Sequence, residues 1–206
     1  GQVRACLGFR KMGKTSILNR VVRELERDTD VLVLFIDASR DDIAGLRAAG
    51  LIGTIAANVR AGTERKATYL TLDTSLPVAT GDTAELGRSL VNAVSEEKRP
   101  VVLLFDEVDY LTPSSPTAGH WKSDFNVFWR NFRVACQEVS RLGRTLGIMV
   151  SGVSSRWFRA ESIDGIENAA LMFVPEEYLG PLPRRASIEM IKRLSRTAGL
   201  QFAAST

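Results

Sequence analysis

The sequence is short of the residues that build metal sites and disulfide frameworks. Its 206 residues contain two cysteines, Cys6 and Cys136, and one histidine, His120. The cysteines are far apart, and each falls in an apolar or helical pattern, which favours reduced packing residues over a metal site or a disulfide. His120 stands in a polar loop, where we expect no zinc site.

Long hydrophobic runs and a strong charge of one sign are also missing. No apolar run reaches the ~18 residues that span a bilayer, and no secretory leader is recognisable, so we expect a cytoplasmic protein without a membrane partner. The formal net charge is +3, with acidic and basic residues spread along the chain, which by itself does not indicate a nucleic-acid binder. A hydrophobic content of 45% is enough for one domain with a real core.

Five apolar runs bounded by turn residues are predicted to be β-strands. They lie at Val3–Leu7, Val31–Ile36, Val101–Phe105, Leu146–Val150 and Ala170–Val174. Helical patterns separate the runs, and strands without polar alternation are typical of a parallel sheet covered on both faces. The sequence therefore predicts an α/β fold.

Three stretches between these runs carry helical signals. An amphipathic pattern begins at Ile17, and another apolar face runs from residue 128 to residue 142. Asp82 followed by Glu85 resembles a capping box. The remainder of 41–99 is mainly helical but harder to assign.

Aromatic residues gather at helical spacing at Trp121, Phe125 and Trp129. They could form a surface on which nucleic-acid bases stack. A helix packed over the sheet explains the same pattern and is the reading we favour.

The stretch GFRKMGKTSI, residues 8–17, matches the phosphate-loop pattern G-x-x-x-x-G-K-[ST] between a predicted strand and a predicted helix. Glycines at both ends let successive backbone N–H groups turn toward an anion, and the helix N-terminus that follows favours negative charge. The residues expected to bind ATP here are Gly8, Arg10, Lys11, Met12, Gly13, Lys14, Thr15 and Ser16.

Two residues of the loop have expected roles in the chemistry. Lys14 would contact the β- and γ-phosphates, and Thr15 would supply a hydroxyl to Mg²⁺. Arg10 and Lys11 could add positive charge near the triphosphate or point to water, and the sequence does not choose between these.

A second motif, VVLLFDEVDYL at residues 101–111, ends an apolar strand in acidic residues. Ligands of open α/β sheets bind at the carboxyl ends of the strands, so Asp106 is expected beside the phosphate loop as a partner of Mg²⁺. Glu107 would act as general base toward the water that attacks the γ-phosphate.

The fourth predicted strand runs into a polar cluster, LGIMVSGVSSRW. Ser151 could hydrogen-bond the attacking water or the γ-phosphate, or simply belong to a turn. Arg156 and Arg159 are candidates to contact the γ-phosphate of the same or a neighbouring subunit.

Together with the later stretch YLGPLPRRASIEMIKRL, these motifs resemble the STAND class of signal-transduction ATPases, which is related to AAA+ and archaeal-type ATPases. The resemblance implies a five-stranded sheet of order 5-1-4-3-2 and a proline, here Pro181, lying against adenine. It also implies an ATPase core at residues 1–180 and the beginning of a helical lid at 181–206, with further domains of the same protein beyond.

The function expected from this resemblance is an Mg²⁺-ATP-dependent switch that hydrolyses ATP slowly and self-associates under nucleotide control. A DNA-associated ATPase of the origin-recognition or transposition type is the alternative. A scaffold that binds nucleotide without hydrolysis is disfavoured by Glu107. A GTPase is disfavoured because no Asn-Lys-x-Asp element is present.

Overall fold

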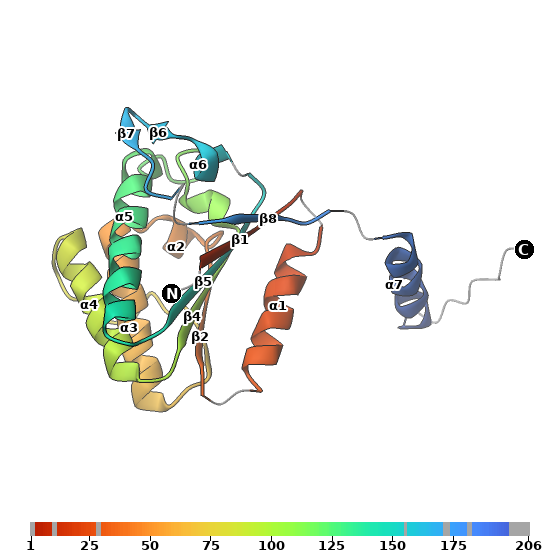
Figure 1. Ribbon diagram of the computed structural model, residues 1–206, viewed down its shortest axis with the longest axis horizontal. Coiled ribbons are helices and arrows are strands. Elements are labelled where there is room, and N and C mark those ends of the chain that lie inside the picture. Colours follow the sequence, from red (N-terminus) through yellow and green to blue (C-terminus); the bar gives the residue numbers. More distant parts are fainter. Residues whose placement is uncertain are drawn as a thin grey trace, which may run out of the picture.

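The computed structural model describes residues 3–9, 12–27, 30–154, 156–170, 174–180 and 183–197. Within these ranges the fold is built on a parallel sheet of six strands in the order β3-β2-β4-β5-β1-β8 (Figure 1). The strands are β1 (Val3–Leu7), β2 (Leu32–Asp37), β3 (Tyr69–Thr71), β4 (Val101–Asp106), β5 (Leu146–Gly152) and β8 (Glu176–Tyr178). A short antiparallel pair, β6 (Ser162–Ile163) and β7 (Ile166–Glu167), lies apart from this sheet.

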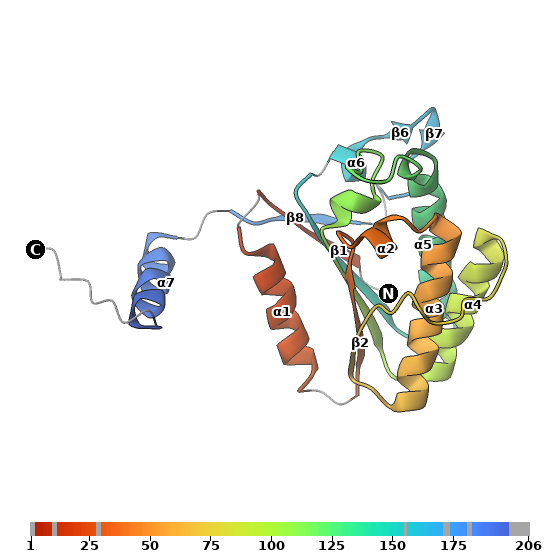
Figure 2. The same cartoon turned by 180° about the vertical axis from the view of Figure 1, so that it is seen from behind.

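Helices cover the sheet on both faces, as Figures 1 and 2 show. Helix α1 (Lys14–Leu25) lies on one face, and α3 (Ala48–Arg65), α4 (Thr83–Glu97) and α5 (Trp121–Arg141) lie on the other. The remaining helices are α2 (Asp41–Ala44), the 3₁₀ turn η1 (Val108–Leu111), α6 (Arg156–Arg159) and α7 (Arg184–Thr197), which stands away from the sheet. No helix in the described part of the chain is both long and apolar enough to cross a bilayer.

The core on the face of α3, α4 and α5 is rich in aromatic side chains. Trp121, Phe125 and Trp129 are at most 1% exposed, and Phe128 packs edge-on against Phe105 of β4. These rings are therefore part of the packing between α5 and the sheet, and the alternative of a base-stacking surface is wrong. Cys136 lies in the same core, and Cys6 is buried in β1; both are free thiols, as predicted.

The predicted order of five strands is confirmed, with one more strand added at the edge. The added strand, β3, falls in the stretch 41–99 that the sequence left open. The capping box is also present, because the Asp82 carboxylate accepts from Glu85 N and the Glu85 carboxylate accepts from Asp82 N. An amphipathic helix therefore begins where the sequence places it.

The fifth strand is misplaced in the prediction. It forms at Glu176–Tyr178, where it pairs with β1, and not at 170–174. Ala170 and Val174, the described ends of the predicted run, lie outside any strand and are joined by a hydrogen bond from Val174 N to Ala170 O. Both are buried in the core, so their apolar character reflects core filling and not strand pairing.

Candidate active site

The phosphate loop joins β1 to α1 at the carboxyl end of the sheet. Gly13 caps α1 with φ 84°, a left-handed conformation that glycine adopts without strain. Gly8 donates its N–H to Gly152 O at 3.2 Å, which ties the loop to the neighbouring strand β5. Arg10 and Lys11 lie outside the described residues, and their predicted roles stay predictions.

Lys14 points back into this loop. Its side chain is almost fully buried, with the residue 5% exposed. The ammonium donates to the backbone oxygens of Gly8 and Phe9, each at 3.1 Å. A buried cation that donates to carbonyl groups can exchange these acceptors for phosphate oxygens without leaving its place.

Thr15 and Asp106 meet although 91 positions separate them. The Thr15 hydroxyl donates to Asp106 Oδ2 at 2.8 Å. Asp106 is 5% exposed at the end of β4, and its other oxygen, Oδ1, accepts from the Ser151 hydroxyl and from Glu107 N. The carboxylate therefore joins the first turn of α1 to the ends of β4 and β5.

The oxygen donors at this point suit a magnesium ion. Thr15 offers one hydroxyl and Asp106 one carboxylate, and Mg²⁺ is held by few protein ligands because it keeps several waters and substrate phosphates. Within the described ranges, no group of three or more histidine, cysteine, aspartate or glutamate side chains could hold a metal ion. A fully protein-built metal cage is thus not the arrangement found in that part of the chain.

Residues after β4 and β5 form the rest of the site. Glu107 adopts a left-handed backbone conformation, φ 52°, and caps the turn η1. Two residues further on, Asp109 accepts hydrogen bonds from Val153 N at 2.6 Å and Ser154 N at 3.0 Å. No motif in the sequence assigns a role to Asp109, which stands there as an acid three residues after Asp106.

Asp37 is a second carboxylate that no motif in the sequence marks. It ends β2 and is the pairing partner of Asp106 on β4. Its Oδ1 accepts from Ser39 N at 3.0 Å and from the Ser39 hydroxyl at 2.6 Å. Asp37 therefore shapes the turn that leads from β2 into α2.

The two candidate arginines lie against other side chains. The Arg156 guanidinium stands over the ring of Trp157, 4.9 Å from its centroid. Arg159 pairs with Glu176 at 2.6 Å and stands over the ring of Tyr178. In this arrangement Arg159 is engaged with strand β8, and a γ-phosphate contact by either arginine stays a prediction.

Of the remaining residues predicted to contact nucleotide, some lie within the described part of the chain and one does not. Met12 and Ser16 are described, and Met12 N donates to Phe9 O at 3.4 Å within the loop. Ser16 is exposed in the first turn of α1. Pro181 lies outside the described residues.

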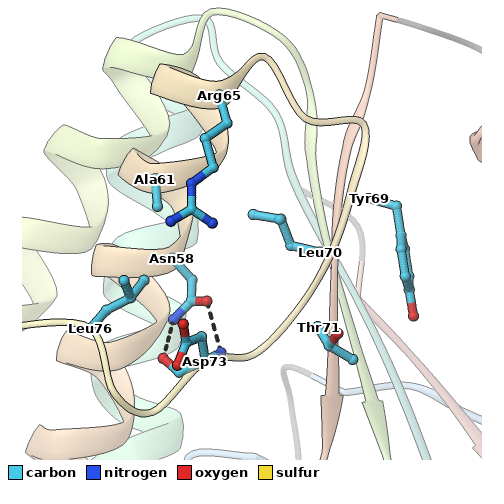
Figure 3. Close-up of a pocket in the computed structure, with 8 residues that line it drawn as sticks. All are labelled: Asn58, Ala61, Arg65, Tyr69, Leu70, Thr71, Asp73 and Leu76. Carbon is cyan, nitrogen blue, oxygen red and sulfur yellow. Dashed lines mark hydrogen bonds between the residues drawn. The ribbon is translucent and has the colours of Figure 1, made fainter.

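A separate pocket of about 330 Å³ opens at the far edge of the sheet, beside β3 and α3 (Figure 3). Its lining residue Asn58 is 2% exposed; the Asn58 side-chain amide donates to Thr54 O and Asp73 O and accepts from Asp73 N. These bonds fix the loop after β3. Because β2, β4 and β5 separate β3 from β1, this pocket is not part of the phosphate-loop site.

Known proteins share this fold. Among solved structures, the chain resembles the Walker-type ATPase paby2304 of Pyrococcus abyssi, with 18% identity, a TM-score of 0.59 and coverage of 98% of this chain and 55% of that one. It also resembles Cdc6p from Pyrobaculum aerophilum, with 17% identity, a TM-score of 0.58 and coverage of 98% and 44%. Drosophila ORC bound to DNA is similar at 10% identity and a TM-score of 0.53, with coverage of 95% and 42%.

The chain thus spans about half the length of the structures it resembles. No curated protein matches the sequence. A family model described as AAA domain matches residues 2–140, which include the phosphate loop and the strand that ends in Asp106. The chain therefore belongs to the AAA domain family of P-loop ATPases.

Proposed function

We propose that this domain binds Mg²⁺-ATP and hydrolyses it. The observation that carries the proposal is the hydrogen bond of 2.8 Å between the Thr15 hydroxyl and Asp106. It joins the hydroxyl that we expect to bind magnesium to the acid of β4, one residue after the buried Lys14. A phosphate loop alone would not require that pairing.

Each residue then has one task in phosphoryl transfer. Gly13 and Lys14 hold the triphosphate through backbone N–H groups and one cation, while Gly8 keeps the start of the loop on β5. Thr15 and Asp106 would hold magnesium, which, when bound, neutralises charge on the phosphate oxygens.

Hydrolysis needs a group that orients and deprotonates water. Glu107 directly follows Asp106 and is the candidate general base. The buried hydroxyl of Ser151 donates to Asp106, which places it at the same strand ends, where it can contact the γ-phosphate or the attacking water. The assignment of ATP over GTP rests on the family and on the absence of a guanine-reading element from the sequence.

The test of the loop is nucleotide binding by the purified protein. Lys14→Ala should weaken binding of a fluorescent ATP analogue by 10-fold or more, since an ammonium–phosphate contact is worth about 1.5–3 kcal/mol. The matched control is Lys122→Ala, which removes an exposed lysine of α5 and should leave affinity unchanged. Equal affinity of Lys14→Ala and wild type would refute the assignment.

Hydrolysis is tested separately from binding. Glu107→Gln should retain nucleotide affinity and lose turnover by about 10²-fold or more, the range typical of a general base. A Glu107→Gln protein with wild-type turnover would remove Glu107 from the proposed mechanism.

We further propose that the larger protein acts on DNA. The support is the shared fold with Cdc6p and with ORC, the latter bound to DNA. The full-length protein should then bind duplex DNA with an affinity that falls steeply as salt rises. The second candidate is a STAND-type signalling switch, which the YLGPLPRRASIEMIKRL stretch favours; it predicts ATP-dependent oligomers that form without DNA.

A further inference from the structure

Asp109 links the turn that follows Glu107 to the segment that follows Ser151 at the end of β5. It lies in η1, after β4, while the amides that it accepts from, Val153 N and Ser154 N, follow β5. One amide donates to each carboxylate oxygen, at 2.6 and 3.0 Å. The link therefore crosses between two strands through both oxygens of one side chain.

Gly152 makes this close approach feasible. A Cβ atom at this position would lie 2.8 Å from Asp109 Oδ2 and 2.9 Å from Val108 Cγ1. Contacts below 3.0 Å are not tolerated in folded proteins without movement of a neighbour. The turn η1 thus packs directly on the end of β5, with no side chain between them.

A second link joins the same strands on the other side of Glu107. The Ser151 hydroxyl donates to Asp106 Oδ1. Glu107 lies between the two anchors, one residue after Asp106 and two before Asp109. Its left-handed backbone, φ 52°, is a conformation that a non-glycine residue keeps only when neighbouring contacts enforce it.

We propose that Asp109 is a positioning residue for ATP hydrolysis, which holds Glu107 and Ser151 in register without touching nucleotide. This inference rests on the proposed function. In this proposal Lys14 and Thr15 determine the affinity for nucleotide. Asp109 affects the rate of the chemical step through the geometry of η1 and the end of β5. A misplacement of about 1 Å in such a group can cost about 100-fold in rate.

The variant that tests this is Asp109→Asn. It keeps the shape of the side chain, but its amide nitrogen cannot accept a hydrogen bond, so one of the two backbone donors loses its acceptor. We expect kcat to fall about 10- to 100-fold, while the Kd for a fluorescent ATP analogue stays within about two-fold of wild type. Hydrogen exchange at Val153 or Ser154 should become faster.

The control is Asp82→Asn, which weakens another carboxylate cap on a backbone N–H, at the exposed start of α4. It should lower stability a little and leave kcat unchanged. This separates a role in positioning from a general loss of stability. Gly152→Ala provides a second route, because it displaces the Asp109 carboxylate without changing its charge.

The outcomes are distinguishable. Wild-type kcat in both Asp109→Asn and Gly152→Ala would refute the positioning role while the proposed ATPase function stands. A fall in affinity as large as the fall in kcat would refute it as well, because Asp109 would then act on binding. Absence of turnover in the wild type would refute the proposed function, and the role of Asp109 with it.

Discussion

Gly152→Ala is the substitution for which the structure gives the sharpest expectation. Gly152 is buried, and a methyl group there would meet Asp109 Oδ2 at 2.8 Å and Val108 Cγ1 at 2.9 Å. Neither neighbour is the free end of a long side chain, since Val108 is core and Asp109 is fixed by two backbone donors. The added carbon must therefore push η1 away from β5.

The cost can be worked out from two contributions. Overpacking of a tight site costs about 1–3 kcal/mol. Hydrogen bonds to a charged acceptor contribute about 1.5–3 kcal/mol each, and a shift of a few tenths of an ångström weakens two of them without abolishing either. We expect a loss of about 2–4 kcal/mol in the free energy of unfolding, or roughly 5–15 °C in Tm for a domain of this size.

The assay is urea unfolding followed by circular dichroism, with Gly87→Ala as the matched control. Gly87 is a buried glycine of α4 where an added Cβ meets nothing nearer than Asn131 Oδ1 at 3.8 Å. Alanine is favoured over glycine inside a helix, so this control should be neutral or more stable by about 0.5–1 kcal/mol. Equal stability of the two variants would show that the contact between η1 and β5 is not tight.

Two further predictions concern titrating groups away from the site. Burial acts to raise the pKa of Glu97, but hydrogen bonds from Arg99 and Thr63 outweigh it and hold that pKa below its ordinary value of 4.5. The stabilisation that the ionised Glu97 gives to the folded state is therefore present above about pH 4.5 and is lost as the pH falls through the lowered pKa. Glu97→Gln should lower the free energy of unfolding by about 1–3 kcal/mol at pH 7, measured by urea unfolding, and should make stability less dependent on pH below pH 4.5. Burial raises the pKa of the Cys136 thiol to about 12, so iodoacetamide at pH 8 should label this residue only after unfolding, and rapid labelling of the native protein, read by mass spectrometry, would contradict the buried position.

Much of the fold follows from local patterns in the sequence. Strands β2, β4 and β5 are predictable because they have no exposed residue on either face and so read as apolar runs, and β1 reads in the same way except at the exposed Arg4. Helix α4 is predictable because its capping box satisfies backbone donors at a definite place. In these elements the local signal and the tertiary environment agree.

The two edge strands show where local patterns fail. Strand β3 has three residues, Tyr69–Thr71, none of them fully buried, so no apolar run marks it. Strand β8 contains Glu176 and Glu177, and it is a strand because its backbone pairs with β1. The apolar run at 170–174 has a stronger strand pattern than 176–178, but its described ends, Ala170 and Val174, are buried in the core outside any strand.

In the candidate site, too, some residues can be predicted from local patterns and others depend on which strands are neighbours. Lys14 and Thr15 are predictable because motif spacing specifies them, and Asp106 is predictable because it ends an apolar strand. The role of Asp109 is not, since it depends on the ends of β4 and β5 being adjacent and on Gly152 leaving room. The sequence shows only an acid three residues after Asp106, and its role can be inferred only once β5 is known to lie beside β4.

The meeting of Thr15 with Asp106 follows from the strand order. After β1 the chain must reach β2, and two strands, β5 and β4, lie between them. Helix α1 makes this crossing, and its Leu18 and Val22 pack with Val33 of β2 and Leu104 of β4. Because the helix crosses over β4, its first turn lies at the carboxyl end of that strand, where Asp106 is. A sheet in which β1 and β2 were neighbours would leave the phosphate loop and Asp106 without this contact, so the topology of the crossover, more than either motif, brings the candidate metal ligands together.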